Sequence, residues 1–179
     1  SYGGGKIISE LFTLNYGRTK LKRAVIFRPH NVYGKDMGSE HVIPQFAMRM
    51  YTALKNTPKE KGPVQFPIQG TGEETRSFIY IDDMVAGILK VIEKGEHLGI
   101  YHIGTETEIT IKELALEMAR YFGRELEIVP GKLQVGGTVR RCPSIKKMQA
   151  LGFEPVVSLK DGLSATIPWY IENAEKNAS

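Results

Sequence analysis

The sequence predicts an α/β fold. Segments with apolar residues at helical spacing alternate along the chain with short runs rich in β-branched and aromatic residues. The chain has 179 residues, of which 41% are hydrophobic and 25% charged, with 19 glycines and 9 prolines. These proportions are typical of a globular domain and exclude collagen-like or low-complexity sequence. The apolar runs are short, so we expect no membrane span and no membrane partner.

The first third of the chain contains two amphipathic helices with a strand between them. In order, the patterns predict a helix over 2–16, a strand over 23–28, a loop over 29–40 and a helix over 43–54. Gly17 is expected to end the first helix, because glycine favours the position after a helix terminus. Pro44 is tolerated because it falls in the first turn of the second helix.

The middle of the chain begins with a polar stretch over 56–63 that contains two prolines and is expected to be a surface loop. Strands are predicted over 64–68 and 77–81, separated by a turn at 69–72. We expect Asp82 to N-cap a helix that continues to about residue 94, a structural role that we assign to Asp83 as well.

The last part alternates strands and helices that carry capping signals. Strands are expected over 100–103 and 125–129. Thr110 and Glu113 form a capping-box pattern for a helix ended by Gly123. Two further helices are predicted, one from a Ser144 cap to about Leu151 and one from the Ser158 and Asp161 pair through Trp169.

Charge permits a site for phosphate but argues against nucleic acid. The 24 basic residues exceed the 20 acidic residues by only four, without the interleaved aromatic residues of nucleic-acid-binding proteins. The basic residues cluster at 18–23 and at 140–147. Such clusters are either solvated faces or sites where arginine grips phosphate through paired hydrogen bonds, and both alternatives stay open.

Cysteine and histidine usage indicates no metal site. The single cysteine, Cys142, excludes an internal disulfide and a thiolate zinc cluster, and indicates a reducing cytoplasm. We interpret it as a small buried residue and not a nucleophile. The four histidines, at 30, 41, 97 and 102, lack metal-ligand spacing.

Tyr2 and Lys6 are spaced for acid–base chemistry. Residues four apart on a helix leave the same face roughly 5–6 Å from each other. A nearby ammonium favours the phenolate of a tyrosine, whose ordinary pKa is about 10, so that it can accept a proton. Taken alone, the pair is equally an ordinary surface contact between two side chains.

Five sequence blocks give this pair a context. They are, in order, Tyr2 with Lys6, RPHNVYG at 28–34, GTGEETRSFIYIDD at 70–83, YHIG at 101–104 and LGFEP at 151–155. In this order and at these intervals they resemble the second half of an extended short-chain dehydrogenase/reductase. The nearest group is the NAD-dependent nucleotide-sugar epimerases and dehydratases. The resemblance covers nearly the whole chain, from Tyr2 to the last predicted helix.

The resemblance implies a role for each residue near the cofactor. Tyr2 would be the catalytic acid and base, and Lys6 its pKa partner and a ligand of the nicotinamide ribose. Pro29 and His30 would lie beside the nicotinamide of NAD, at the end of a strand where open α/β sheets place ligands. Asn31 would donate to the diphosphate of the nucleotide-sugar, although the same residues also suit an ordinary turn.

The resemblance also places substrate contacts further along the chain. The segment with Val42 and Ile43 would line the nucleotide base through backbone groups, although these apolar residues equally suit the core. Arg76, after a glycine-rich turn, would clamp the diphosphate. The alternative for Arg76 is a surface salt bridge to Glu73 or Asp82.

A second diphosphate-binding arginine is implied at Arg140 or Arg141. The family pattern continues with an acidic residue where this chain has Ser144. This departure leaves the register uncertain by one residue, so both arginines remain candidates.

The resemblance implies a fold in two parts. Residues 1–34 would be the end of the NAD-binding Rossmann domain, which is a doubly wound α/β sheet. Residues 35–179 would be mainly a small mixed α/β domain that binds the nucleotide-sugar, with about 69–104 returning to the Rossmann sheet. The substrate would be epimerised or dehydrated through a transient keto-sugar, and the full-length enzyme would be a cytoplasmic homodimer.

The glycine-rich dinucleotide turn of the family has no counterpart in this sequence. Gly3, Gly4 and Gly5 open a helix without a preceding strand, so they do not form that fingerprint. We therefore expect the chain to be the C-terminal portion of the enzyme, inactive when isolated, with apolar faces bare on the first helix and strand. The alternatives are a nucleotide-sugar-binding module without redox chemistry and a module that supplies a helix to a dimer.

Overall fold

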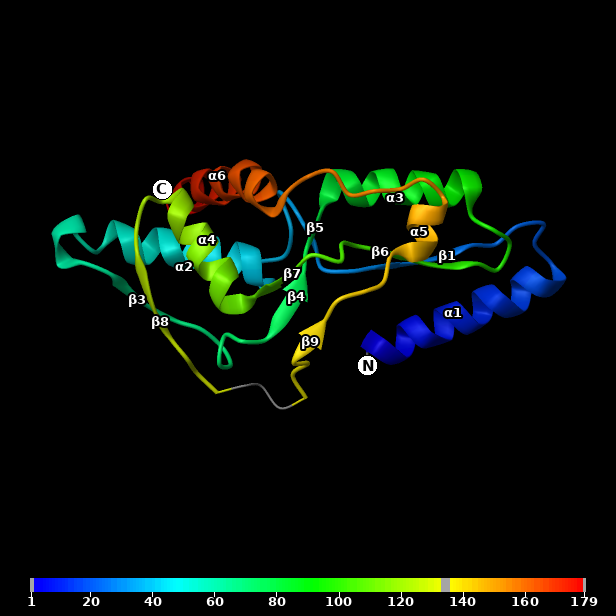
Figure 1. The fold of residues 1–179 in the computed structure, drawn as a ribbon, viewed down its shortest axis with the longest axis horizontal. Coiled ribbons are helices and arrows are strands. Elements are labelled where there is room, and N and C mark those ends of the chain that lie inside the picture. Colours follow the sequence, from blue (N-terminus) through cyan, green and yellow to red (C-terminus); the bar gives the residue numbers. More distant parts are fainter. Residues whose placement is uncertain (1, 133–135, 179) are drawn as a thin grey trace.

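The fold has two lobes (Figure 1), and each lobe has its own hydrophobic core. The computed structural model describes residues 2–132 and 136–178, with side chains from 3 to 132 and from 136 to 174. Among the described residues, no helix combines the length and the apolar character needed to cross a membrane. The alternation of helices and short, mostly parallel strands confirms the predicted α/β class.

The first lobe is built on one parallel strand pair. Its elements are α1 (Tyr2–Thr19), β1 (Ile26–Pro29), α3 (Ile81–Lys94), β6 (Ile100–Ile103) and α5 (Lys146–Ala150). β1 and β6 pair in parallel from Ile26 opposite Ile100 to Pro29 opposite Ile103. In Figure 1, α3 lies on one side of this pair and α1 on the other. The core of the lobe lies between α3, α5 and β6, where Tyr101 and Ile103 are buried.

The second lobe packs three helices against another parallel pair. Its elements are α2 (Val42–Lys55), the 3-10 turn η1 (Lys59–Lys61), β3 (Val64–Pro67), α4 (Ile111–Tyr121), β8 (Leu126–Val129) and α6 (Leu159–Ala178). β3 and β8 are parallel, with Val64 opposite Leu126. The core of the lobe is formed by apolar side chains of α2, α4 and α6, among them Met50, Met118 and Ile167.

Five very short strands lie between the two lobes. They are β2 (Val32–Tyr33), β4 (Thr75–Ser77), β5 (Ile79–Tyr80), β7 (Glu108–Thr110) and β9 (Arg140–Arg141). β2 pairs in parallel with β5, and β4 is the central strand between β7 and β9. The division of the chain at residue 34 into two domains stays a prediction.

The prediction of a single strand over 77–81 is wrong, because two short strands occupy this region. The chain makes β4 and β5, which belong to different sheets, and Phe78 stands between them. The helix that follows begins at Ile81 with Tyr80 as its N-cap, so Asp82 lies in the first turn and is not the cap. Asp83 has the expected structural role, because its buried carboxylate accepts hydrogen bonds from two backbone amides at 156–157.

Gly17 does not end the first helix, which continues to Thr19. The glycine is buried, and a Cβ atom there would lie 2.5 Å from Cδ2 of Leu98 and 3.1 Å from Cβ of Ala24. Its role is therefore close packing of α1 on the turn before β6.

The capping box predicted at Thr110 and Glu113 and the cap predicted at Ser158 are confirmed, and the cap predicted at Ser144 is wrong. Thr110 and Glu113 cap α4 reciprocally, and the hydroxyl of Ser158 accepts from the Asp161 amide at 3.1 Å. Ser144 does not cap α5, whose N-cap is Ile145. The Ile145 amide donates instead to the carboxylate of Glu106, 3.1 Å away, which the local sequence does not reveal.

Replacing Gly87 by alanine tests the contact between α3 and β6. A Cβ atom at Gly87 would lie 2.6 Å from Cγ2 of the buried, β-branched Ile103. Overpacking is expected to exceed the gain in helix propensity, for a net loss of about 1–2 kcal/mol in the free energy of unfolding. Urea unfolding followed by circular dichroism measures it.

The matched control is Gly5→Ala in α1, where a Cβ atom meets nothing within 4 Å. The free energy of unfolding of this variant is expected to rise by about 0.5–1 kcal/mol, because alanine loses less backbone entropy than glycine on folding. Equal stabilisation by both substitutions would contradict the close packing of α3 on β6.

Candidate active site at the strand ends

Lys6 and Pro29 line one cleft between α1 and β1, which we call the helix cleft. It has a volume of roughly 710 Å³ and is bordered by residues 6–13 of the helix and 25–29 of the strand. Tyr2 begins α1, one helical turn before Lys6, and its side chain lies outside the described residues. The predicted pairing of Tyr2 and Lys6 therefore rests on their spacing along the helix.

An ion pair holds α1 across β1. Arg28 donates from Nε to Oε2 of Glu10 at 3.0 Å and from Nη2 to Oε1 at 2.5 Å. Hydrogen bonding from Arg28 holds the pKa of Glu10 below its ordinary value. Both side chains are partly exposed, so the pair adds little stability, but its two-point geometry fixes how the helix crosses the strand.

His30 and Asn31 follow directly from the carboxyl end of β1. The His30 amide donates to the carbonyl of Ile103 at 3.0 Å, which extends the pairing with β6 by one residue. Asn31 has a φ of 38°, a region that asparagine tolerates better than most residues. Its side-chain amide donates to the carbonyl of Ser77 at 2.8 Å. These bonds turn the chain from the first lobe toward a second pocket.

This second pocket, the arginine pocket, has a volume of roughly 560 Å³. It collects four of the predicted substrate residues: Asn31, Val42, Arg76 and Arg141. Much of its polar wall is completed by the segment 136–138 and by Glu40, Gln45, Gln69 and Glu74. Residues from six separate parts of the sequence thus meet in one hollow.

Arg76 is anchored by backbone carbonyl groups. It donates to the carbonyl oxygens of Thr75 at 2.7 Å, Thr138 at 2.6 Å and Val139 at 3.3 Å. Neither alternative salt bridge, to Glu73 or to Asp82, is present among the ion pairs of the described residues. Burial, followed by the neighbouring Arg141, lowers the pKa of Arg76.

The short strand β9 separates the two candidate arginines. Successive side chains of a strand point to opposite faces of the sheet. Arg140, opposite Thr75, pairs with the carboxylate of Glu108, and its Nε lies 3.0 Å from Oε1. Arg141, opposite Arg76, faces the arginine pocket. Arg140 is therefore held outside the pocket, and Arg141 stands beside Arg76.

Val42 and Ile43 take different positions at the start of α2. Val42 lines the arginine pocket, whereas the side chain of Ile43 is 1% exposed and belongs to the core of the second lobe. The proposed contact of the Ile43 backbone with a nucleotide base stays a prediction.

Glu74 is a pocket residue that sequence reasoning missed. Its buried carboxylate accepts hydrogen bonds from the amides of Thr71 at 3.1 Å and Gly72 at 2.9 Å. Burial raises the pKa of Glu74, but backbone hydrogen bonds outweigh it and hold the pKa below its ordinary value. Gly70 and Gly72, with φ of 79° and 88°, make the tight turn that wraps the carboxylate. In the sequence, these two glycines indicate the tight turn and are the feature that could have pointed to Glu74.

Cys142 is partly buried, slightly less than predicted. Its thiol lies near the backbone carbonyls of Thr105, Glu106 and Pro143, at 3.7–3.9 Å. Burial raises the pKa of this thiol, which disfavours the nucleophilic thiolate. Within the described part of the chain, no cluster of three or more histidine, cysteine or acidic residues could hold a metal ion.

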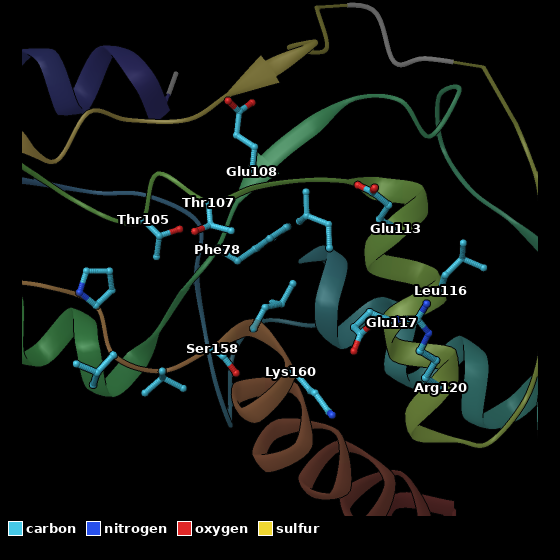
Figure 2. Close-up of a pocket in the computed structure, with 15 residues that line it drawn as sticks. Phe78, Thr105, Thr107, Glu108, Glu113, Leu116, Glu117, Arg120, Ser158 and Lys160 are labelled. Atoms are coloured by element: carbon cyan, nitrogen blue, oxygen red, sulfur yellow. Dashed lines mark hydrogen bonds and ion pairs between the residues drawn. The ribbon is translucent and has the colours of Figure 1, made fainter.

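A further cleft, of roughly 650 Å³, lies between β7, α4 and the start of α6, and we call it the outer cleft (Figure 2). None of the predicted site residues lines it. Its carboxylates are engaged: Glu108 with Arg140, Glu113 in the cap of α4 and Glu117 with Arg120. The outer cleft is therefore separate from the candidate active site, although Phe78 borders both it and the arginine pocket.

The parallel strands, with the arginine pocket beyond their carboxyl ends, and the likeness to solved structures place this chain among Rossmann-type proteins. The NAD dependent epimerase/dehydratase family matches residues 1–104 of this chain. Because the match covers more than half of the chain, the protein belongs to this family.

Curated relatives and solved structures agree with this family. The chain is 32% identical over 179 residues to human dTDP-D-glucose 4,6-dehydratase, with 96% of this chain and 48% of the relative covered. It is 30% identical over 154 residues to the putative GDP-L-fucose synthase 2 of Arabidopsis thaliana, covering 84% of this chain and 45% of the relative. The chain thus spans about half the length of these relatives.

Two solved structures share the fold. A dTDP-glucose 4,6-dehydratase from Streptomyces venezuelae, solved with NAD bound, superposes with a TM-score of 0.81 at 30% identity and covers 98% of this chain and 52% of its own. A UDP-glucose 4-epimerase from Thermotoga maritima, solved with UDP-glucose, gives a TM-score of 0.84 at 26% identity. In that pair the coverage is 97% of this chain and 54% of the epimerase.

The residues of the helix cleft fit one end of the family's cofactor, NAD. Lys6 supplies an ammonium with donors suited to ribose hydroxyls, and Pro29 provides an apolar wall at the carboxyl end of β1. The glycine-rich turn that would hold the pyrophosphate is not found in the sequence. The fit therefore concerns the nicotinamide end of the cofactor.

Replacing Glu74 by glutamine is expected to loosen the turn that borders the arginine pocket. A side-chain NH2 group would face backbone amides that now donate to the carboxylate, for a cost of about 1–3 kcal/mol in the free energy of unfolding. Because the pKa of Glu74 is lowered, its contribution is present above 4.5 and is lost as the pH falls below that ordinary value. Thermal unfolding between neutral and acidic pH measures both effects.

Glu73→Gln is the matched control, since Glu73 is the exposed neighbour of Glu74. Its free energy of unfolding is expected to stay within about 0.5 kcal/mol of that of the unaltered chain. If the two variants were equally stable at neutral pH, Glu74 would not be what holds this turn.

Proposed function

We propose that this chain is the substrate-binding, C-terminal portion of an NAD-dependent enzyme that epimerises or dehydrates a nucleotide-diphospho-sugar through a transient keto-sugar. The observation that carries the proposal is the pair Arg76 and Arg141, side by side on one sheet face at the arginine pocket. Neither arginine takes part in an ion pair within the described residues. Two such cations suit a ligand with two adjacent negative charges.

The electrostatics of the pocket support a diphosphate. Two neighbouring guanidinium groups repel each other, which is one reason why the pKa of Arg76 is lowered. The carboxylate of Glu74 lies in the same pocket, but its oxygens accept from the turn at 71–72. A diphosphate would relieve the repulsion and accept hydrogen bonds from both arginines. Val42 and the start of α2 would then lie toward the nucleotide base.

Acid–base chemistry is assigned to the start of α1. The Lys6 ammonium favours the phenolate of Tyr2, one helical turn away, so that Tyr2 accepts the proton of a sugar hydroxyl. NAD, when bound, supplies the acceptor for the hydride that leaves the same carbon. Lys6 and Pro29 would hold its nicotinamide riboside at their end of the helix cleft, with His30 next to it, and the Glu10–Arg28 pair keeps α1 in position.

The exposed apolar face of α1 supports the view that a further portion of the enzyme covers it. Ile7, Leu11 and Phe12 are 57–64% exposed, and Phe27 of β1 is 41% exposed. Surfaces of this kind are normally covered by another domain or subunit. We propose that a dinucleotide-binding half and a second copy cover them in a cytoplasmic, full-length homodimer, and that the isolated chain is inactive.

One observation favours a second candidate, a nucleotide-sugar-binding module without redox chemistry. The residues proposed to contact the diphosphate, Asn31, Arg76 and Arg141, all line the arginine pocket of this chain. The coding sequence upstream of Ser1 separates the two candidates. A Gly-x-x-Gly-x-x-Gly motif about a hundred residues earlier would support the enzyme.

Substituting the three arginines one at a time tests the arginine pocket. Arg76→Ala and Arg141→Ala each remove a charge-assisted contact worth about 1.5–3 kcal/mol, so binding of a nucleotide-sugar should weaken roughly 10- to 100-fold. Calorimetric titration with UDP-, GDP- and dTDP-sugars measures the change and identifies the base. Arg140→Ala is the control, because Arg140 is paired with Glu108, and it should bind like the unaltered chain.

Equal losses in all three arginine variants would indicate a general effect of positive charge and would contradict a specific diphosphate site. No binding of any nucleotide-sugar to the unaltered chain would contradict a self-contained binding module and the placement of the diphosphate at Arg76 and Arg141.

A further inference from the structure

A hydrogen-bonded histidine pair lies at the carboxyl ends of β1 and β6. Nε2 of His30 and Nδ1 of His102 are 2.6 Å apart, and the ring centroids are 4.9 Å apart. Arg28 is opposite His102 in the strand register, and His30 is two residues after Arg28. Because side chains alternate along a strand, these three side chains share one face of the pair. Glu10 reaches the same face from α1 through its bond to Arg28.

The surroundings of the two rings are mostly cationic. Arg28 and Arg141 act on His30, and Arg28 and Lys147 act on His102. Glu10 is the opposing carboxylate near His102. Burial lowers the pKa of both histidines most, and the charge of His102 lowers the pKa of His30 further. Each ring is therefore held toward its neutral form.

The bond itself limits how many protons the pair can carry. One of the two facing nitrogens must donate and the other must accept. A single added proton leaves that arrangement possible, because an imidazolium can still donate to a neutral imidazole. Two added protons would make both facing nitrogens donors and would break the bond. The pair thus behaves as one coupled titrating unit.

We propose that His102 is a positioning residue that fixes the ring orientation and the neutral state of His30 at the nicotinamide end of the site. This rests on the proposed function, which locates the nicotinamide beside His30. The oxidised nicotinamide ring carries a positive charge and the reduced ring does not. A neutral His30 therefore tolerates both forms, whereas a protonated His30 would repel the oxidised one.

The coupling has a consequence for stability. A histidine whose folded pKa is lowered binds fewer protons in the native state than in the unfolded state. Stability is therefore highest above the unfolded value of about 6.5 and falls as the pH drops through that value toward the lower folded pKa.

The test is a nuclear magnetic resonance titration of the histidine ring protons in the chain, in His102→Asn and in His41→Asn. Asparagine keeps a hydrogen-bonding group at 102 but cannot take up a proton. We expect the signals of His30 and His102 to titrate together below about pH 6.5, and His102→Asn to raise the midpoint of His30 by roughly 0.5 pH unit. His41→Asn, which removes an exposed histidine from another element, should leave the His30 midpoint unchanged.

An unchanged His30 midpoint in a folded His102→Asn variant would overturn the coupling. Backbone amide spectra establish folding, and His102→Gln serves in its place if the asparagine variant is disordered. Oxidised nicotinamide mononucleotide, which lacks the adenosine half, is then added in excess to the unaltered chain. A shift of the His30 signals is expected, and its absence would overturn the placement at the nicotinamide. Loss of the proposed function would show separately, as failure of nucleotide-sugars to bind at Arg76 and Arg141.

Discussion

The parallel pairing of β1 with β6 is the constraint on which the candidate active site depends. It joins segments more than seventy residues apart, from Ile26 opposite Ile100 to Pro29 opposite Ile103. Both faces of this small sheet are used, with α3 and its core on one face and the Glu10–Arg28 and histidine contacts on the other. At the carboxyl end of β1 the chain turns through Asn31, which lines the arginine pocket, and continues into β2, which pairs with β5.

Much of the fold could be predicted where local chemistry decides the structure. The capping residues Thr110 and Ser158 predicted two helix starts correctly, because each cap and its partner lie three residues apart. The cap predicted at Ser144 failed because a carboxylate from Glu106, distant in sequence, satisfies the amide instead. Strands of two or three residues, such as β7 and β9, are too short for any alternation to be recognised, so only their partners define them.

The same distinction holds for the candidate site. The spacing of Tyr2 and Lys6 is a property of one helix and is visible in sequence. The choice between Arg140 and Arg141 is not, because it depends on how β9 aligns with β4. His102 was passed over because its partner, His30, lies 72 residues earlier and meets it only through the strand register. Residues whose roles arise from pairing between distant segments need the structure to be found.

The alignment of β9 has a consequence for how this site can change. Its two arginines divide into one bound to Glu108 and one turned into the pocket because side chains alternate along a strand. A shift of β9 by one residue would exchange them, as a slip of register moves every side chain to the other face. A change in length of the segment before β9 would thus put Arg140 into the pocket in place of Arg141 and would leave one guanidinium of β9 there. Two consecutive arginines on β9 therefore keep a cation facing the pocket in either register.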